Sequence, residues 1–358
     1  MLLNNSDKIL ILASASTGNN VFCTPAIRFL RKHLPNATID VIALNKLSAE
    51  VFENSPDINR LIVLNKWFGN ARAFDRLAQK YNQHICLNIN ALKKIKGRET
   101  ILKVIPDYIN GVARGEQQLQ FVADLVGKPI TNEDRHYVIG NGVAGHFDLK
   151  NVLPKDVLVN IHLGCGTTSL HGWKFFYKNR ANNNRLWSVD QYIALGHALI
   201  KANPDIRIVV TGTKNEAFLA KQFQQAVPNT INLVGKTSAK DVFDLMQDMA
   251  LFIAHDCGVF HLAAASNVPI VGLYGPTDPI LAGPYPVRPQ HHIIKAESMA
   301  AISTTRVLEA ALDLLQKFPR LAKAWFTQYY RALCAGVWFT FGRWLNFSYK
   351  RNCAGSPK

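Results

Sequence analysis

The sequence predicts an α/β protein with two doubly wound parallel-sheet domains that face each other across a cleft. Two observations predict this class. Short apolar runs rich in strand formers alternate with helix-compatible segments, and helical connections of this length join parallel strands. The series also occurs twice, on either side of residues 140–156, which are rich in Gly, Asn and charged residues. The 358 residues are enough for two domains of ordinary size.

The first half of the chain contains four apolar runs that predict strands and four segments whose spacing predicts helices. Residues 17–20 predict a turn after the first strand, and Pro35 ends the first helix. After Lys93 the pattern is less regular, in a basic loop of sequence KKIKGRE. The expected strands are 8–16, 38–44, 60–64 and 84–90, and the expected helices are 21–34, 46–53, 70–81 and 115–126.

A second series of the same kind follows. Its expected strands are 157–163, 206–211, 230–234, 251–255, 269–274 and 292–295, and its expected helices are 187–202, 216–226, 239–249, 258–267 and 304–318. We therefore expect an N-terminal domain over residues 1–150, a C-terminal domain over residues 151–318 and a tail over residues 319–358.

The composition is typical of a packed globular protein, with 48% hydrophobic residues. No run of about 18 apolar residues is free of charged or polar breaks, so we expect no membrane-spanning helix. The apolar run near the N-terminus follows Asp7 and Lys8 and lacks a usual cleavage site, which favours a strand over a secretion signal. The six cysteines form no C-x-x-C pair, which favours free thiols in a reducing compartment. We therefore expect a cytoplasmic protein.

The charge is strongly positive, with 41 Lys and Arg against 25 Asp and Glu. Such a balance suggests an anionic partner: nucleic acid, anionic lipid or an acidic substrate. No recognised nucleic-acid module accompanies the charge, so we do not expect nucleic-acid binding.

Part of this charge lies in the tail, residues 319–358, which contains seven Lys and Arg, three Trp and no Asp or Glu. Aromatic and basic residues alternate there at a helix-compatible spacing, as in an amphipathic helix on an anionic membrane. We expect this basic aromatic tail to bind anionic lipid, which places the protein on the inner face of the cytoplasmic membrane. Two alternatives stay open: the tail covers the N-terminal domain, or it binds a protein partner.

Residues 251–286 carry the clearest functional signal: a strand, a break at Asp256, a short helix and a second strand. Gly258 opens the helix, and the unpaired N–H groups of its first turn, at the positive end of the helix dipole, suit a phosphate. His261 lies in the same turn. The loop GPTDP, with Thr277, leaves the next strand at the same edge, where open α/β sheets bind ligands.

The string D-C-G-V-F-H-L-A-A-A-S-N-V-P, followed by L-Y-G-P-T-D-P, resembles the signature of glycosyltransferase family 9, the ADP-heptose lipopolysaccharide heptosyltransferases. The spacing matches without interruption. The family prefers Ser or Thr where this chain has Cys257, which removes a hydroxyl beside the phosphates but leaves the backbone donors. The alternative is that Gly258, His261 and Pro269 only shape a tight crossover.

The resemblance implies the GT-B fold, in which two Rossmann-like domains face each other. It implies inverting transfer of a sugar, heptose from ADP-heptose, to a lipopolysaccharide core or a related glycolipid, with the acceptor on the N-terminal domain and the donor on the C-terminal one. We expect no cofactor and no metal, because no D-x-D lies in a suitable loop and the histidines are not at ligand spacing. Cations and the helix end at Gly258 then stabilise the leaving diphosphate.

The turn S-T-G-N-N-V-F-C-T-P-A resembles the N-terminal motif of the family, with Pro25 and Ala26 at the expected distance from Gly18. The family's Asp, the base for the acceptor hydroxyl, corresponds here to Asn19. An amide orients a hydroxyl but cannot take its proton. Three possibilities stay open: another group is the base, activity is low, or the chain is a non-catalytic relative that binds the nucleotide sugar.

Residues 162–187 resemble the family's strand end H-x-G and a Lys, two residues before a Trp, that supplies a cation to the diphosphate. Arg185 occupies that position here, two residues before Trp187, so the charge is kept and its geometry changes. Gly164 and Cys165 follow the strand and are assigned to the donor site. The loop between Cys165 and Arg185 carries Lys174, Lys178 and Arg180. It is interpreted as a flap over the donor or acceptor, or as a basic surface loop.

The sequence T-G-T-K-N-E at residues 211–216 resembles the family's G-x-x-x-E, whose carboxylate binds the nucleotide ribose. Glu216 can accept hydrogen bonds from both ribose hydroxyls. The alternative is that this carboxylate only stabilises the first turn of its own helix.

Overall fold

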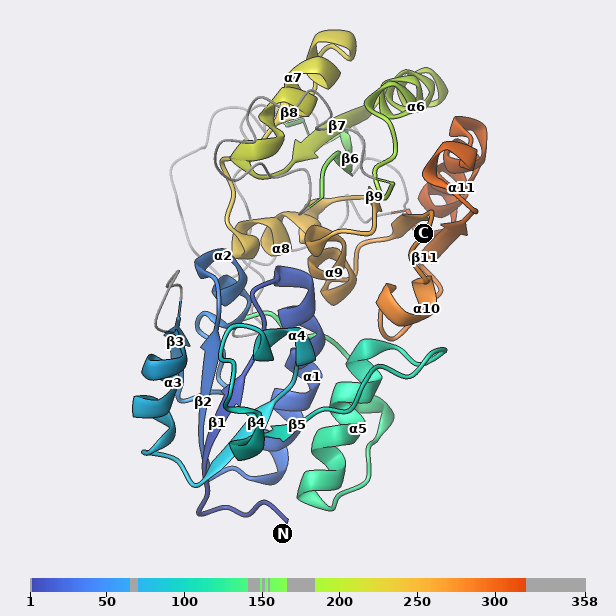
Figure 1. The fold of residues 1–358 in the computed structure, drawn as a ribbon. Coiled ribbons are helices and arrows are strands. Elements are labelled where there is room, and N and C mark those ends of the chain that lie inside the picture. The colour runs from blue at the N-terminus through green and yellow to red at the C-terminus, as the bar shows by residue number, and fades with distance from the viewer. Residues whose placement is uncertain are drawn as a thin grey trace, which may run out of the picture. The chain divides into compact units, whose positions relative to one another are not determined.

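The computed structural model describes residues 2–64, 70–140, 149, 152–153, 155–165 and 184–319, which contain two parallel sheets and the helices packed on them (Figure 1). The predicted α/β class is therefore confirmed. The basic aromatic tail from Arg320 onward lies outside the described residues, as does the loop with Lys174, Lys178 and Arg180. In the described residues, no helix combines the length and hydropathy needed to span a bilayer.

The first sheet has five parallel strands in the order β3-β2-β1-β4-β5. The chain moves outward from β1 to β3 and then crosses to the other side with β4, so the topological switch point lies between β1 and β4. Helices α1 and α5 cover one face, and α3 and α4 cover the other. The elements are β1 (Lys8–Leu12), α1 (Thr17–His33), β2 (Thr38–Ala43), α2 (Lys46–Ala49), η1 (Glu50–Phe52), β3 (Arg60–Val63), α3 (Asn70–Ala78), β4 (Gln83–Cys86), α4 (Ile89–Leu92), η2 (Glu99–Ile101), β5 (Lys103–Val104), α5 (Arg114–Val126) and η3 (Asn132–Asp134).

The second sheet has six parallel strands in the order β11-β10-β9-β6-β7-β8. Its switch point lies between β6 and β9. Helices α6, α7 and α11 pack on one face, and α8 and α9 pack on the other. The elements are β6 (Val157–His162), α6 (Val189–Ala202), β7 (Ile206–Thr211), η5 (Lys214–Glu216), α7 (Ala217–Ala226), β8 (Ile231–Asn232), α8 (Ala239–Asp248), β9 (Leu251–His255), α9 (Gly258–Ala265), β10 (Ile270–Tyr274), α10 (Pro279–Ala282), β11 (His291–Lys295), η6 (Met299–Ala301) and α11 (Thr304–Lys317).

The central strands are apolar along their whole length because both faces of each sheet are covered. Every residue of β9 and β10 is buried, and so is every residue of β1 after Lys8. One hydrophobic cluster continues from the first sheet, through α1 and α5, to α8, α9 and the second sheet. The elements that carry the predicted site residues therefore stand on a common packed core.

Helix α1 begins four residues earlier than the sequence predicts. The expected turn over residues 17–20 is the first turn of this helix, so Asn19 is a helical residue. Pro25 lies inside α1, where it cannot donate to the carbonyl of Val21. The Thr24 hydroxyl donates to that carbonyl at 2.8 Å instead, which explains why the helix continues past the proline.

Two other boundaries differ from the sequence prediction. The fourth strand ends at Cys86, because the side chain of Asn88 accepts from the Asn90 amide at 3.1 Å and begins α4. Strand β5, which the irregular pattern after Lys93 did not predict, consists of two residues and is too short to show alternation. On β11, His291 is buried and His292 is exposed, since adjacent residues of a strand point to opposite faces of the sheet.

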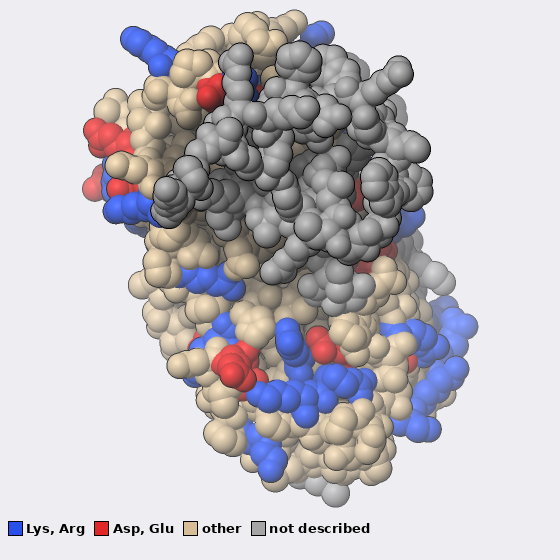
Figure 2. All heavy atoms as spheres, turned by 180° about the vertical axis from the view of Figure 1, so that it is seen from behind, with Lys and Arg blue, Asp and Glu red and all other residues tan. Residues whose placement is uncertain are grey.

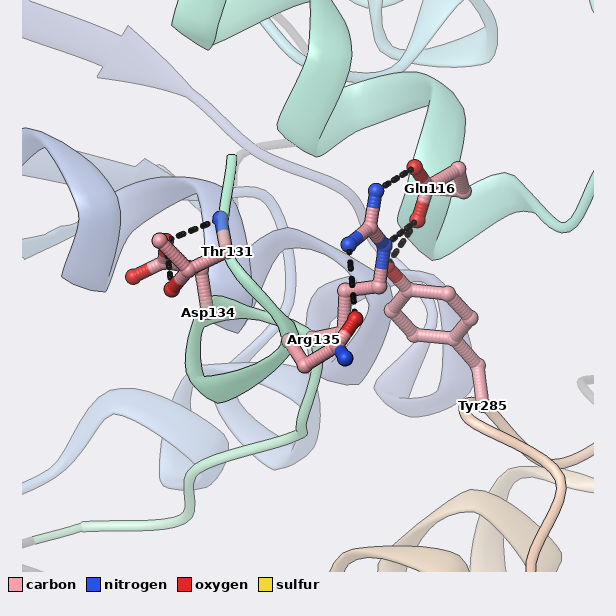
Figure 3. A network of polar contacts seen from close by, with 6 residues as sticks. Glu116, Thr131, Asp134, Arg135 and Tyr285 are labelled. Carbon is pink, nitrogen blue, oxygen red and sulfur yellow. Dashed lines mark hydrogen bonds and ion pairs between the residues drawn. The ribbon is translucent and has the colours of Figure 1, made fainter. Parts of the chain in front are cut away.

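A polar network joins the α5 region to the loop after α10 (Figure 3). Glu116 accepts from the Arg135 guanidinium at 2.9 and 3.0 Å and from the Tyr285 hydroxyl. The Tyr285 ring also packs on Tyr137, with 5.7 Å between ring centroids. Burial raises the pKa of the Glu116 carboxyl, but the bonds from Arg135 and Tyr285 outweigh burial and lower the pKa overall. This contact therefore joins residues of the two halves of the chain through a carboxylate that is ionised at neutral pH.

Basic side chains occur in several places on the face shown in Figure 2, with acidic side chains between some of them. Some basic residues of the described chain form local ion pairs. Lys32 contacts Asp134 at 2.7 Å, and Arg60 contacts Asp40 at 3.0 Å. Each such pair is electrically neutral, so the net charge of +16 comes from the basic residues in excess of the 25 Asp and Glu.

We predict that Phe260→Ala lowers the free energy of unfolding by about 3 to 5 kcal/mol, because it empties a fully buried position between Phe252 and Tyr274. Denaturation in urea, followed by fluorescence, measures the change. Phe260→Leu retains most of the volume and should cost about 1.5 kcal/mol or less. Equal unfolding midpoints for Phe260→Ala and wild type would contradict this packing.

Candidate functional site

The predicted donor-site residues all follow the carboxyl ends of four adjacent strands of the second sheet. The loops after β6 and β9 border the switch point, where ligands of open parallel sheets bind, and the loops after β7 and β10 flank them. The residues brought to this edge are Gly164, Cys165, Glu216, Asp256, Cys257, Gly258 and Thr277.

The first turn of α9 has no side-chain cap. Ser188, Ser238, Asp278 and Ser303 cap α6, α8, α10 and α11 by accepting backbone N–H bonds. Cys257, at the corresponding position of α9, makes no such bond, and neither does Ser16 before α1. Their first-turn N–H groups, at the positive ends of both helices, are therefore suited to an external anion.

These two helix starts meet each other. A Cβ atom on Gly18 would lie 2.6 Å from the Cδ2 atom of His261 and 3.5 Å from the Cα atom of Gly258. A Cβ atom on Gly258 would lie 3.3 Å from the Cβ atom of Thr17. Glycine at both positions is what permits this approach, which brings Asn19 on α1 close to the first turn of α9.

His261 is buried at this junction, with 4% of its surface exposed. Its ring packs edge-on against Phe22, with 4.5 Å between centroids. Burial lowers the pKa of His261 to about 4, which Asp256 opposes and Arg114 reinforces. The imidazole is therefore neutral at pH 7. Its Nδ1 atom is buried without a hydrogen-bond partner in the part of the chain that the structure describes.

Asp256 lies between a histidine and an arginine. Its Oδ1 atom is 4.0 Å from His261 Nε2, and its Oδ2 atom is 3.6 Å from Arg185 Nη1. The Arg185 side chain is 34% exposed, while that of Asp256 is 10% exposed. Asp256 therefore links Arg185 to the first turn of α9.

Glu216 is held more tightly than the sequence indicates. Its Oε2 atom accepts from the Thr213 amide at 2.5 Å and from the Thr213 hydroxyl at 3.1 Å, so it completes a capping box. Its Oε1 atom is 4.0 Å from His162 Nε2. A Cβ atom on Gly164 would lie 2.1 Å from this same Oε1 atom. The Oε2 atom therefore stabilises the first turn of its own helix, which is the alternative interpretation of Glu216. The Oε1 atom lies beside Gly164 at the strand edge.

Cys165 and Cys257 are both buried, and neither forms a disulfide within the described residues. Burial raises the pKa of the Cys257 thiol well above its ordinary value, so it is neutral at physiological pH. The hydroxyl of Thr277 is buried and has no hydrogen-bond partner within the described ranges. The Thr277 hydroxyl is therefore available to bind a ligand.

Asn19 uses both atoms of its amide within the protein. Nδ2 donates to the Ser14 hydroxyl at 3.4 Å, and Oδ1 accepts from Arg114 Nη1 at 3.4 Å. The Arg114 guanidinium also lies over the ring of Tyr108, 4.6 Å from its centroid. The amide is therefore fixed beside a cation at the position where the family has a carboxylate.

Arg114 is the residue that sequence reasoning missed. It lies at the start of α5, 95 positions from Asn19, and no motif accompanies it. Only the packing of α5 against α1 brings the two together. A basic residue at the start of a helix was the one available signal, and it is a weak one because the helix dipole disfavours it.

No three His, Cys, Asp or Glu side chains gather into a metal-binding group within the described residues. The cationic groups at the two helix starts, as the structure describes them, are Arg114 and Arg185. This geometry can bind an anion between the first turns of α1 and α9, with Arg114 on one side and Arg185 on the other.

Comparisons with known proteins bear on the family and the fold of the chain. The family model described as glycosyltransferase family 9 (heptosyltransferase) matches residues 175–311. Lipooligosaccharide heptosyltransferase 2 of Haemophilus ducreyi is 25% identical over 313 residues, which cover 77% of this chain and 86% of the relative. These matches identify residues 175–311 as a glycosyltransferase family 9 (heptosyltransferase) domain. The protein is a transferase.

Two further family 9 relatives are informative. Lipooligosaccharide heptosyltransferase 2 of Haemophilus influenzae is 31% identical over 98 residues, which cover 26% of this chain and 28% of the relative. The structure of E. coli heptosyltransferase WaaC with ADP has a TM-score of 0.65 and 17% identity, and the match covers 86% of this chain and 99% of that one. At this identity the structural likeness shows the fold, which is the GT-B fold that the sequence predicted.

The buried histidines of this family 9 transferase predict a pH dependence of stability. Burial lowers the pKa values of His255 and His261 to about 4, against an ordinary value of 6.5. Between pH 6.5 and 4 the unfolded chain therefore binds more protons than the folded one, and the free energy of unfolding falls as the pH falls. Above pH 6.5 this contribution is complete.

We predict that His261→Gln reduces the slope of unfolding free energy against pH, between pH 4.5 and 6, by about 1.4 kcal/mol per pH unit. Urea titrations at several pH values give this slope. His292→Gln, which replaces an exposed histidine of β11, is measured in parallel as the matched control. A His261→Gln slope equal to that of wild type would show that this imidazole is not held neutral by burial.

Proposed function

We propose that this protein transfers heptose from ADP-heptose, with inversion, to a lipopolysaccharide core or a related glycolipid acceptor. The observation that carries the proposal is the uncapped first turn of α9 at the switch point, with Arg185 beside it. The relatives support this donor and acceptor class, because they are lipooligosaccharide heptosyltransferases and a heptosyltransferase whose structure contains ADP.

In this proposal the C-terminal domain, residues 151–318, binds the nucleotide sugar. The diphosphate lies at the backbone N–H groups after Cys257, with Arg185 supplying a bidentate cation, and the Oε1 atom of Glu216 accepts from the ribose. Since the leaving group is an anion, these donors stabilise it as the glycosidic bond to the diphosphate breaks. The hydroxyl of Thr277 is a further donor at this edge.

The acceptor lies on the N-terminal domain, residues 1–150, beside Asn19. The amide can orient the attacking hydroxyl, and Arg114 can hold an anionic group of the acceptor. The proton must go to another group, because an amide cannot take it. His261 and Asp256 are the side chains with a free lone pair that the described structure places nearest the junction of α1 and α9.

The first test is calorimetric titration with ADP, together with an assay of heptose transfer to a purified core glycolipid. Arg185→Gln should weaken ADP binding about 10- to 100-fold, since it removes a charge-assisted contact. The control Arg306→Gln removes an exposed arginine on α11 and should leave ADP affinity unchanged. Undetectable ADP binding by the folded wild-type protein would exclude the proposed function.

A second candidate is a non-catalytic relative that binds the nucleotide sugar, and Asn19 is the observation that favours it. Asn19→Asp distinguishes the two. A carboxylate here would be held ionised by Arg114 at 3.4 Å, so we predict a rise in transfer rate of about tenfold or more if a missing base limits the reaction. Tight ADP binding with no transfer by either protein would favour the non-catalytic relative.

We also propose, from its composition, that the basic aromatic tail binds anionic membrane and places the protein on the inner face of the cytoplasmic membrane. We predict that the full chain sediments with vesicles containing phosphatidylglycerol and that a variant ending at Pro319 does not. Vesicles of neutral phosphatidylcholine are the control. Equal sedimentation of both proteins would assign lipid binding to another part of the chain.

A further inference from the structure

His255 is a fully buried imidazole that the proposed reaction does not use. It ends β9 and directly precedes Asp256. Its Nδ1 atom lies 3.1 Å from the hydroxyl oxygen of Tyr192, a bond that one imidazole tautomer accepts and the other donates. An imidazole at 0% exposure cannot contact substrate in this structure, so its role must be exerted through its neighbours.

Tyr192 lies in the first turns of α6 and is itself fully buried. Its ring packs edge-on against Trp187, with 4.7 Å between centroids. The indole Nε1 atom of Trp187 donates to the carbonyl of Ile302 at 2.9 Å. Ser188 begins α6 between these two aromatic residues by accepting from the Gln191 amide at 3.2 Å. Hydrogen bonds of Trp187, Ser188 and Tyr192 thus all fix the start of α6.

Arg185 belongs to the same segment, two residues before Trp187. Successive residues at the end of β9 therefore contact it: Asp256 contacts Arg185 at 3.6 Å, and His255 contacts Tyr192 at 3.1 Å. A long arginine side chain loses rotamer entropy when it is ordered. If the backbone at Arg185 is fixed, the guanidinium has fewer positions available and is held closer to the geometry that reaches the diphosphate site.

The charge state of His255 fits this role. Burial lowers its pKa to about 4, while Asp256 raises it and Arg185 lowers it further. At pH 7 the imidazole is therefore neutral and adds no positive charge next to Arg185. A protonated imidazole there would compete for Asp256 and repel the guanidinium.

We propose that His255 and Tyr192 are positioning residues that hold Arg185 against the donor's diphosphate through the start of α6. The inference rests on the proposed nucleotide-sugar function. In this inference, the buried hydrogen bond between His255 and Tyr192 orients Arg185, the cation at the position of the family's lysine. It explains why His255, the residue next to Asp256, contacts Tyr192.

The test is a double-mutant cycle on the full chain, with ADP as the probe in calorimetry. Tyr192→Phe keeps the ring against Trp187 and removes only the hydroxyl. We expect it to weaken ADP binding about fivefold, as the loss of one hydrogen bond does. In the Arg185→Gln background the same change should weaken binding less than twofold, since the residue it positions is already gone. Heptose transfer should show the same pattern in KM for the donor.

Tyr81→Phe is the matched control, because it also removes a tyrosine hydroxyl, which donates to Asp40 and accepts from Arg60 in the first sheet, and should not change ADP affinity. His255→Asn offers a second route, with an amide in place of the imidazole, and should behave as Tyr192→Phe does. An equal loss of affinity from Tyr192→Phe in both backgrounds would overturn the inference in favour of a purely structural role. No ADP binding by wild type would instead defeat the proposed function itself.

Discussion

The contact between the first turns of α1 and α9 is the constraint on which the site depends. Two helix N-termini carry partial positive charges, so bringing them together is electrostatically unfavourable unless negative charge lies nearby. Glycines 18 and 258 make the approach sterically possible. Asp256 supplies one carboxylate at the junction, and an anionic ligand would supply more. The geometry thus gives a physical reason for an anion to bind here that is independent of any resemblance.

Burial determines how charge is distributed around this junction. His255 and His261 are neutral because desolvation lowers their pKa values, so the positive charge is carried by Arg185, Arg114 and the helix ends. Arginines keep their charge in such surroundings, where a histidine loses it. The site therefore combines permanent cations with uncharged imidazoles, an arrangement that binds an anion without depending on pH near neutrality.

The replacement of the family's Asp by Asn19 has a local consequence. A carboxylate beside Arg114 would form an ion pair, whereas the uncharged amide accepts a weaker bond from the guanidinium at 3.4 Å. More of the positive potential of Arg114 then extends toward His261, whose pKa it helps to lower. An amide in place of a carboxylate thus changes the electrostatics of the whole junction.

The alternation of apolar runs and helices determined by itself that the chain forms two parallel sheets, and the string from Asp256 to Thr277 identified the crossover that carries the first turn of α9, because residues adjacent in sequence share one crossover. Tertiary structure decided the rest. Arg114 meets Asn19, and His255 meets Tyr192, only after helices far apart in the chain pack together. Glu216 divides its oxygens between a capping box and the strand edge. Such contacts depend on packing between distant elements, which periodicity and spacing along one segment do not record.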